Sequence, residues 1–268
     1  MVDIRQTREY GNYLSEIGWT VEHLGGVNYF IKKLPLIGAI MKVQRPKQVD
    51  TPKVIELTKK YKVKKIINEP KTEAEAKYLI SCGYKQTSSY LPSKTLFLDL
   101  TKSKERLLKE MRKDARVAVN KNGDLKISDY GEKVEEFRKS WKRAVGLRRY
   151  VPFLDKLIAL KRSFGKDALF IAQKDSGAIF LKADKVAYYW QAFTGAEGRK
   201  NQTQYKIVWG GILWARKRGA RVFDFEGIYD ERFPNKSWLG FTHFKKSFGG
   251  KEVNYPGAFV KKLLPFNI

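Results

Sequence analysis

Acidic and basic side chains gather near the C-terminal end of the chain, where Phe223–Tyr255 reads as strand, loop, helix and strand. Asp224 and Glu226 alternate with phenylalanines, the period-two pattern of a strand with one buried face. Lys245 and Lys246 follow on the helix, beside an apolar stripe. A strand–loop–helix–strand unit brings these acids and lysines together at its mouth, where polar ligands bind in such units. We therefore expect a site at the mouth of this unit.

A second group of residues suits the binding of anions. Arg148, Arg149 and Tyr150 place two planar cationic donors beside an aromatic ring. This combination fits phosphate, carboxylate or nucleobase recognition, and capping of helix ends by the two cations is the alternative. Tyr189 lies in the aromatic strand AYYWQAF, and Lys42 lies on a predicted strand with a basic edge. For Lys42, a solvated sheet face is the simpler interpretation.

The composition limits the class of protein. The chain has 54 Lys and Arg against 28 Asp and Glu, a formal charge of +26, which predicts a polyanionic partner: nucleic acid, an anionic membrane surface, or both. The single cysteine, Cys82, and two histidines argue against a disulfide framework and against a metal site. There is no secretory signal pattern, and the apolar runs are too short to span a bilayer. We expect a cytoplasmic protein, peripheral at most to the inner membrane face.

The hydrophobic pattern changes period along the chain in an order typical of a mixed α/β fold. From Leu96 on it predicts strand, helix, strand, two helices, three antiparallel strands, helix, strand, helix and strand. A mixed sheet splayed near its centre, with helices on both faces, is the simplest packing of this order. The same pattern predicts a single helix over Lys104–Asn120 and a polar loop over Gly195–Asn201.

One part of this order occurs twice. Helix, turn, strand, loop, helix, glycine and strand follow each other from Thr51 to about Tyr84 and again from Lys206 to Tyr255. This predicts two related α/β subdomains, of which the first is shortened. We place the N-terminal subdomain at residues 1–95, with the tail 257–268 packed on it, and the C-terminal subdomain at residues 96–256.

The predicted arrangement is similar to the fold of the GNAT N-acetyltransferases. In that fold a glycine-rich loop before a helix binds the pyrophosphate of coenzyme A through its backbone amides. The equivalent stretch, Gly195–Thr203, lacks the Arg/Gln-x-x-Gly-x-Gly/Ala pattern of that loop. The resemblance implies two GNAT-like subdomains, and the departure argues against coenzyme A.

A duplicated GNAT-like unit without this loop resembles the FemABX family of peptidoglycan-bridge aminoacyltransferases. The resemblance runs through AYYWQAF, ILWARKRGARVFDFEGI and GFTHFKKSFGGKEVNYPGAF. It also includes Leu98-Asp99-Leu100, the helix ending in Arg116 and the hairpin Leu34–Pro46. The chain would be a compact form, without the coiled-coil arm of the larger members.

The resemblance implies transfer of an amino acid from aminoacyl-tRNA to an amine on the stem peptide of a peptidoglycan precursor, lipid-linked or UDP-linked. Because the aminoacyl ester is already activated, no cofactor is expected. The implied partners are the charged tRNA and the precursor, with weak contact to an anionic membrane, and we expect a monomer.

The resemblance also implies roles for single residues. Lys245 would stabilise the oxyanion or the leaving 3′-oxygen, and Phe244 would shape the acceptor channel. Asp224 or Glu226 would guide or deprotonate the amine, with a structural ion pair as the alternative for each. The precursor's phosphates and sugar would meet Arg148, Arg149, Tyr150, Tyr189 and Lys42.

Two other classes of function stay open from the sequence. One is a coenzyme A-dependent GNAT N-acyltransferase, which needs a pyrophosphate-binding loop. The other is a non-catalytic nucleic-acid-binding protein, which explains the charge but gives no purpose to the F-K-x-x-F-G-G run at residues 244–250.

Overall fold

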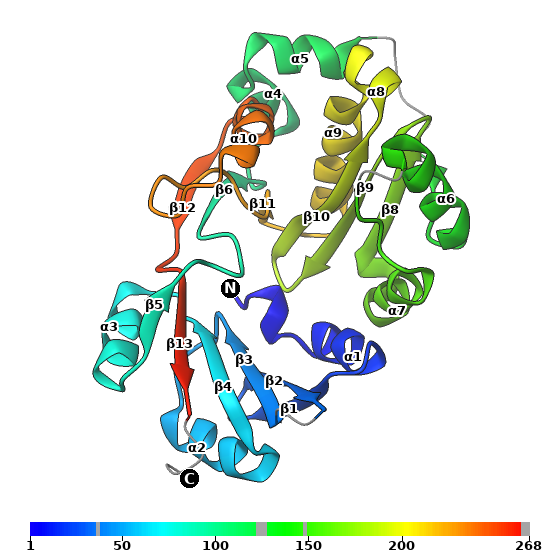
Figure 1. Ribbon diagram of the computed structural model, residues 1–268. Coiled ribbons are helices and arrows are strands. Elements are labelled where there is room, and N and C mark those ends of the chain that lie inside the picture. The colour runs from blue at the N-terminus through cyan, green and yellow to red at the C-terminus, as the bar shows by residue number, and fades with distance from the viewer. Residues whose placement is uncertain (36–37, 122–127, 147–148, 264–268) are drawn as a thin grey trace. The chain divides into compact units, whose positions relative to one another are not determined.

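The computed structural model describes residues 1–35, 38–121, 128–146 and 149–263 (Figure 1). Arg148 therefore lies outside the described residues. Contacts divide the chain into two compact units. Unit 1 contains Met1, Thr95–Tyr229 and Asn235–Val253, and unit 2 contains Val2–Lys94, Asp230–Pro234 and the residues from Asn254 on.

Unit 2 is built on a six-stranded mixed sheet in the order β1-β2-β3-β4-β13-β5. Its apolar core includes Tyr29 and Met41 from the sheet and Leu57 and Leu79 from the helices. Its elements are η1 (Ile4–Gln6), α1 (Arg8–Glu16), β1 (Thr20–Leu24), β2 (Val27–Leu34), β3 (Gly38–Gln44), α2 (Thr51–Tyr61), β4 (Val63–Glu69), α3 (Glu73–Ser81), β5 (Lys85–Thr87) and β13 (Ala258–Lys262).

Capping side chains mark where two helices of unit 2 begin. The Asp50 side chain accepts a hydrogen bond from the Lys53 amide, and proline follows in the first turn of α2. Thr72 and Glu75 form a reciprocal capping box at the start of α3. Strand β13 comes from the far end of the chain and pairs antiparallel with both β4 and β5, between which it lies (Figure 1).

Unit 1 is built on a seven-stranded sheet in the order β12-β6-β11-β10-β9-β8-β7. Its elements are β6 (Lys94–Asp99), α4 (Lys104–Glu110), α5 (Lys113–Asn120), β7 (Ser128–Asp129), α6 (Val134–Val145), α7 (Leu154–Phe164), η3 (Gly165–Asp167), β8 (Ala168–Gln173), β9 (Ser176–Ala183), β10 (Val186–Thr194), α8 (Ala196–Lys200), α9 (Thr203–Lys217), β11 (Val222–Asp224), η4 (Lys236–Trp238), α10 (Leu239–Lys246) and β12 (Lys251–Asn254).

The two sheets repeat one pairing pattern. In unit 1, α9 connects the parallel pair β10 and β11, and β11 then pairs antiparallel with β6. In unit 2, α2 connects the parallel pair β3 and β4, and β4 then pairs antiparallel with β13. The predicted mixed α/β fold with a repeated unit is confirmed, and β13 takes in unit 2 the position that β6 takes in unit 1.

Two local predictions are wrong. The helix predicted over Lys104–Asn120 is broken, because Met111 and Arg112 have extended ψ angles of 149° and 153°. The Arg112 amide donates instead to the Ser247 carbonyl, 2.9 Å away, just after α10. The segment predicted as a loop over Gly195–Asn201 contains the short helix α8.

Across the described ranges, no helix is long and apolar enough to cross a membrane.

Candidate active site

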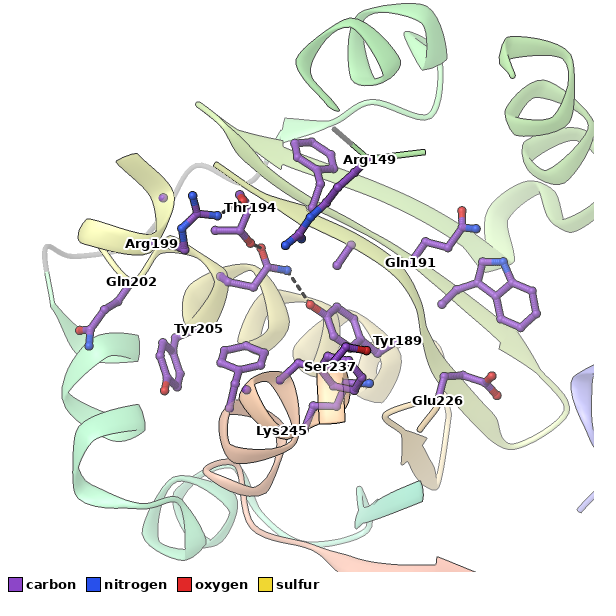
Figure 2. A pocket seen from close by; sticks show the side chains of 18 residues that line it. Arg149, Tyr189, Gln191, Thr194, Arg199, Gln202, Tyr205, Glu226, Ser237 and Lys245 are labelled. Carbon is purple, nitrogen blue, oxygen red and sulfur yellow. Dashed lines mark hydrogen bonds between the residues drawn. The ribbon is translucent and has the colours of Figure 1, made fainter. Parts of the chain in front are cut away.

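A cavity of about 750 Å³ opens in unit 1 between β10, the segment α8–α9 and helix α10 (Figure 2). Strand β10 contributes the floor, through Tyr189 and the residues that follow it. Gly198, Arg199, Gln204 and Tyr205 line one side, and the residues on the other are Glu226, Ser237, Gly240, Phe241, Phe244 and Lys245. Three of the four predicted catalytic residues, Glu226, Phe244 and Lys245, therefore line this cavity together with the aromatic strand.

Lys245 is buried, with 8% of its surface exposed. Its Nζ donates hydrogen bonds to the carbonyl oxygens of Phe225, at 2.7 Å, and Gly227, at 2.6 Å. Both carbonyls belong to the turn after β11, in which Glu226 has a left-handed φ of 50°. A non-glycine residue in this region costs about 1–2 kcal/mol, so the surrounding structure has to stabilise the turn.

The surroundings of Lys245 also change its acidity. Burial lowers the pKa of Lys245 to about 8, although the nearby charges of Glu226 and Asp224 act in the opposite direction. The ammonium nitrogen lies 4.8 Å from the ring centroid of Phe241 and 5.6 Å from that of Tyr189. An ammonium group has three protons, and the two carbonyls accept two of them. The third is available to a group bound in the cavity.

We expect this buried lysine to make the stability of the protein depend on pH. Between pH 8 and the ordinary lysine pKa of 10.5, the unfolded chain binds more protons than the folded one, so the free energy of unfolding rises with pH. Urea unfolding should show a rise of about 2 kcal/mol from pH 7.5 to 9.5 for the wild type relative to Lys245→Met. Parallel pH dependences of the two proteins would show that the lysine pKa is not lowered.

Phe244 forms an aromatic wall of the cavity. Its ring contacts Tyr205 edge-on, with 4.8 Å between centroids, and Phe248, with 5.4 Å. Tyr205 in turn stacks on Phe248 at 5.6 Å. The wall is therefore held by packing of Phe244 and Phe248 against Tyr205 of α9.

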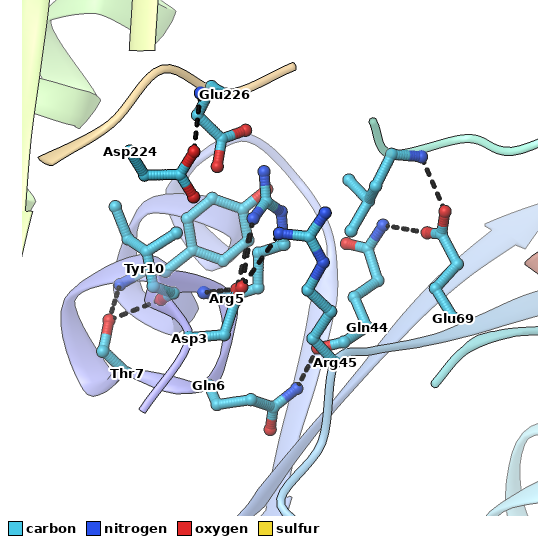
Figure 3. Close-up of polar contacts among 12 residues, drawn as sticks. Asp3, Arg5, Gln6, Thr7, Tyr10, Gln44, Arg45, Glu69, Asp224 and Glu226 are labelled. Carbon is cyan, nitrogen blue, oxygen red and sulfur yellow. Dashed lines mark hydrogen bonds and ion pairs between the residues drawn. The ribbon is translucent and has the colours of Figure 1, made fainter. Parts of the chain in front are cut away.

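The two predicted carboxylates lie in different positions. Asp224 is 1% exposed and accepts hydrogen bonds from the Thr95 hydroxyl, at 2.5 Å, and from the Glu226 amide, at 2.8 Å (Figure 3). It is not among the residues that line the cavity. Glu226 is half-buried and lines it. Of the two, Glu226 is therefore placed to meet a substrate, and Asp224 helps to hold the turn.

The predicted anion-binding residues are not all brought together. Arg149 lines the cavity, whereas Tyr150 is 67% exposed and does not. Lys42 belongs to unit 2, where its Nζ lies 5.2 Å from the ring centroid of Trp19 and 5.7 Å from that of Tyr90. Tyr189 is 8% exposed and lies on the cavity floor.

Several residues of the site were not predicted from the sequence. Arg199, on α8, lines the same cavity as Arg149 and donates to the Thr194 carbonyl at 2.7 Å. Gln204, on the first turn of α9, bonds the Tyr189 hydroxyl. Arg199 belongs to no pattern, because the segment around α8 has no apolar period that predicts its helix. Gln204 lies on a predicted helix, but its contact with Tyr189 is not local in the sequence.

The loop before α9 is closed by a carboxylate of the protein itself. Asp175 accepts hydrogen bonds from the backbone amides of Glu197, at 3.0 Å, and Gly198, at 2.7 Å. A Cβ at Gly198 would lie 1.8 Å from the Ser176 hydroxyl, so only glycine fits at this position. These amides therefore already have an anionic partner.

Unit 2 contains a buried polar cluster of its own (Figure 3). Asp3 forms ion pairs with Arg5, at 3.2 Å, and Arg45, at 3.3 Å. Burial acts to raise the pKa of Asp3, but the two guanidinium groups outweigh it and hold this pKa below its usual range. The Arg45 guanidinium also stacks on Tyr255, 3.6 Å from the ring centroid. The cluster fixes the N-terminal segment of unit 2 to its sheet.

Within the described part of the chain, no group of three His, Cys, Asp or Glu side chains is arranged to hold a metal ion. The donors of the cavity are nitrogen and hydroxyl groups, which suit an anionic or carbonyl-bearing ligand.

Comparison with known structures gives the class of the fold. Over 97% of the chain and 92% of its counterpart, the structure is similar to that of FemX, with a TM-score of 0.80 and 16% identity. It is also similar to the C-terminal domain of a putative lysylphosphatidylglycerol synthetase from Agrobacterium fabrum, with a TM-score of 0.66, 11% identity, and coverage of 97% and 89%. A tandem GNAT protein from the clavulanic acid biosynthesis pathway gives a TM-score of 0.55, 12% identity, and coverage of 90% and 81%. The chain thus has the duplicated GNAT-like fold predicted from its sequence.

A family model also matches part of the sequence. The model of the FemAB family matches residues 157–267, the segment that includes α10 and most of the cavity. This match and the similarity to FemX confirm the predicted resemblance to FemABX proteins. A search of curated proteins gives no match.

Proposed function

We propose that the protein transfers an aminoacyl group from aminoacyl-tRNA to an amine on the stem peptide of a peptidoglycan precursor. The observation that carries this proposal is the position of Lys245, a buried cation held by two carbonyls with one N–H available to the cavity. The FemAB family match and the similarity to FemX support the same class of reaction.

The proposed reaction needs one bond to form and one to break at the acyl carbon. The neutral amine attacks the ester carbonyl, a C–N bond forms, and the bond from the acyl carbon to the 3′-oxygen of the tRNA breaks. The amine loses a proton and the 3′-oxygen gains one. Lys245 donates its third N–H to the oxygen on which negative charge develops, where such a donor acts most strongly. Glu226, which lines the cavity, is our candidate to accept the proton of the amine.

The donor is proposed to be a charged tRNA and not coenzyme A. Asp175 holds the amides of Glu197 and Gly198, and a diphosphate at this position would meet the like charge of its carboxylate. Arg149 and Arg199 line the cavity, and Arg149 has no acidic partner among the residues described. Two guanidinium groups at a cavity of a chain with a charge of +26 favour a phosphate-bearing donor.

The acceptor is proposed from the family. Tyr150, Arg148 and Lys42 stay candidates for its phosphates and sugar, and weak contact with an anionic membrane would bring the enzyme to a lipid-linked precursor. Because one structural neighbour is a putative lysylphosphatidylglycerol synthetase domain, phosphatidylglycerol is the acceptor to test beside the precursors.

The proposed function is tested by supplying tRNA charged with a pool of labelled amino acids to three acceptors: a UDP-linked muropeptide, a lipid-linked precursor, and phosphatidylglycerol vesicles. Label should pass to a muropeptide amine. The control reaction replaces charged tRNA with deacylated tRNA and acetyl-CoA. Label that passes only to phosphatidylglycerol, or acetyl transfer in the control, would contradict the proposal.

Binding gives an independent prediction. We expect tRNA to bind with an affinity that falls about a thousandfold between 50 and 200 mM salt, as for proteins that neutralise about six phosphates, because bound Lys and Arg release counterions. Acetyl-CoA should show no heat of binding at micromolar concentrations in calorimetry. Tight binding of acetyl-CoA without any binding of tRNA at low salt would favour the coenzyme A-dependent alternative.

A further inference from the structure

Three side chains form a line of hydrogen bonds on the floor of the cavity. The Thr194 hydroxyl donates to Gln204 Oε1 at 3.0 Å, and Gln204 Nε2 donates to the Tyr189 hydroxyl at 2.7 Å (Figure 2). Gln204 and Tyr189 are each 8% exposed, and all three residues line the cavity. The line thus connects the rim beside Arg199 with the neighbourhood of Lys245.

The direction of these hydrogen bonds is set by the surroundings of Gln204. Its Nε2 also lies 3.5 Å from the Gly177 carbonyl, which can only accept. The amide therefore turns its NH₂ toward Gly177 and Tyr189, and its oxygen toward Thr194. A phenol oxygen that accepts a hydrogen bond keeps its own proton to donate. Among the described residues, none accepts that proton from Tyr189.

Packing fixes the Tyr189 ring so that its hydroxyl cannot turn elsewhere. The ring stacks on Phe180 at 5.6 Å and contacts Phe225 edge-on at 6.1 Å. Burial raises the pKa of Tyr189 well above its ordinary value of 10.0, so the hydroxyl stays protonated at physiological pH. The ring centroid lies 5.6 Å from Lys245 Nζ, so two proton donors line the same part of the cavity.

We propose that Tyr189 donates its hydroxyl proton to the acyl oxygen of the substrate together with Lys245, and that Gln204 is the positioning residue that makes this donation available. The inference rests on the proposed function. Paired donors aimed at one oxygen are the usual means of stabilising a tetrahedral oxyanion. No covalent step is added, because Tyr189 supplies only a hydrogen bond.

The test reverses the hydrogen bond without removing it. In Gln204→Glu, the carboxylate accepts from both Thr194 and Tyr189, so the tyrosine proton turns away from the cavity while size and packing are kept. We expect kcat to fall about a hundredfold with little change in KM, as in Tyr189→Phe, and no further loss in the double variant. As pH falls and the new carboxyl gains a proton, it can donate again, and the activity of Gln204→Glu should recover relative to the wild type.

A matched variant separates hydrogen-bond direction from added charge. Gln191→Glu brings the same charge to the same cavity from β10, and it should lose much less activity than Gln204→Glu. Equal losses in the two variants, or wild-type kcat in Tyr189→Phe, would overturn the inference while leaving the proposed function intact.

A measurement without substrate tests the role of Gln204 directly. The ¹³Cζ resonance of Tyr189, assigned by its absence in Tyr189→Phe, reports whether the phenol oxygen accepts or donates. It should move between the wild type and Gln204→Glu, and an unchanged resonance would show that Gln204 does not set the direction. A wild-type protein that transfers no aminoacyl group would overturn the proposed function and the role of Tyr189 with it, while this resonance still decides the role of Gln204.

Discussion

Replacing Lys245 by methionine is expected to lower the turnover of aminoacyl transfer by about a hundredfold or more, with a smaller effect on KM. The variant removes the charge and the N–H that faces the cavity but keeps most of the side-chain stem. Because the negative charge on the acyl oxygen develops only in the transition state, the lost interaction affects the rate more than substrate binding. Steady-state kinetics with charged tRNA and a muropeptide acceptor measures both constants.

The burial of Lys245 makes a stability measurement part of this experiment. Methionine leaves the carbonyls of Phe225 and Gly227 without their donor, and an unpaired buried acceptor costs about 1–3 kcal/mol. Thermal unfolding must therefore show that the variant is folded at the assay temperature.

Lys246→Met is the matched control for this prediction. Lys246 is 47% exposed and pairs with Glu252 at the surface, so its loss should change stability by less than about 1 kcal/mol and leave turnover unaffected. A folded Lys245→Met enzyme that works at the wild-type rate would show that the lysine is structural only.

Replacing Gly211 by alanine is expected to destabilise unit 1 by about 1–3 kcal/mol. Gly211 lies on α9, and a Cβ there would be 2.3 Å from Cε1 and 2.4 Å from Cζ of Phe180. Phe180 is fully buried between Tyr189 and Phe223, so its ring has no room to retreat. The cost of overpacking should exceed the gain of about 0.5–1 kcal/mol from a better helix former. The midpoint of thermal unfolding should fall by roughly 2–4 °C per kcal/mol.

Gly240→Ala is the control, because it adds the same methyl group to a helix without a clash. Among the described residues, no heavy atom beyond its chain neighbours and the backbone of α10 lies within 4 Å of the position of its Cβ, so the unfolding midpoint should stay the same or rise slightly. A Gly211→Ala protein as stable as Gly240→Ala would mean that α9 can move away from β9. In that case the stacking of Phe180 on Tyr189 would not be tightly constrained.

The sequence predicts those parts of the fold that have a clear hydrophobic period. The predicted aromatic strand AYYWQAF lies in β10, which runs over Val186–Thr194, and the helix predicted after the three antiparallel strands is α9. The strand predicted to carry both Asp224 and Glu226 is β11, but it ends at Asp224, because the Asp224 carboxylate accepts a hydrogen bond from the Glu226 amide and the chain turns. Such a side-chain contact leaves no trace in the apolar pattern.

Residues of the candidate site were predicted where they belong to a sequence motif. They were missed where their position depends on contacts with residues far away in the sequence. Lys245 and Glu226 were found from their motif, but position alone would place Lys245 at the surface, since nothing local shows that two carbonyls hold it. Arg199 was missed because α8 depends on capping by Asp175, about twenty residues earlier in the chain. Gln204 lies on the predicted helix α9, but no local pattern shows its hydrogen bond to Tyr189. The break at Met111 likewise depends on a bond to Ser247.

The position of β13 has a consequence for biosynthesis. In the sheet of unit 2, strand β13 (residues 258–262) lies between β4, which ends at Glu69, and β5, which begins at Lys85. While the ribosome is still making unit 1, the earlier strands of unit 2 have an unpaired edge on either side of this gap. Pairing over such a sequence separation is slow, so unit 2, whose first strands are made before unit 1, should complete its sheet only after unit 1 has been made. During that interval the unpaired strand edges of unit 2 are exposed, and we expect chaperones to bind this segment then.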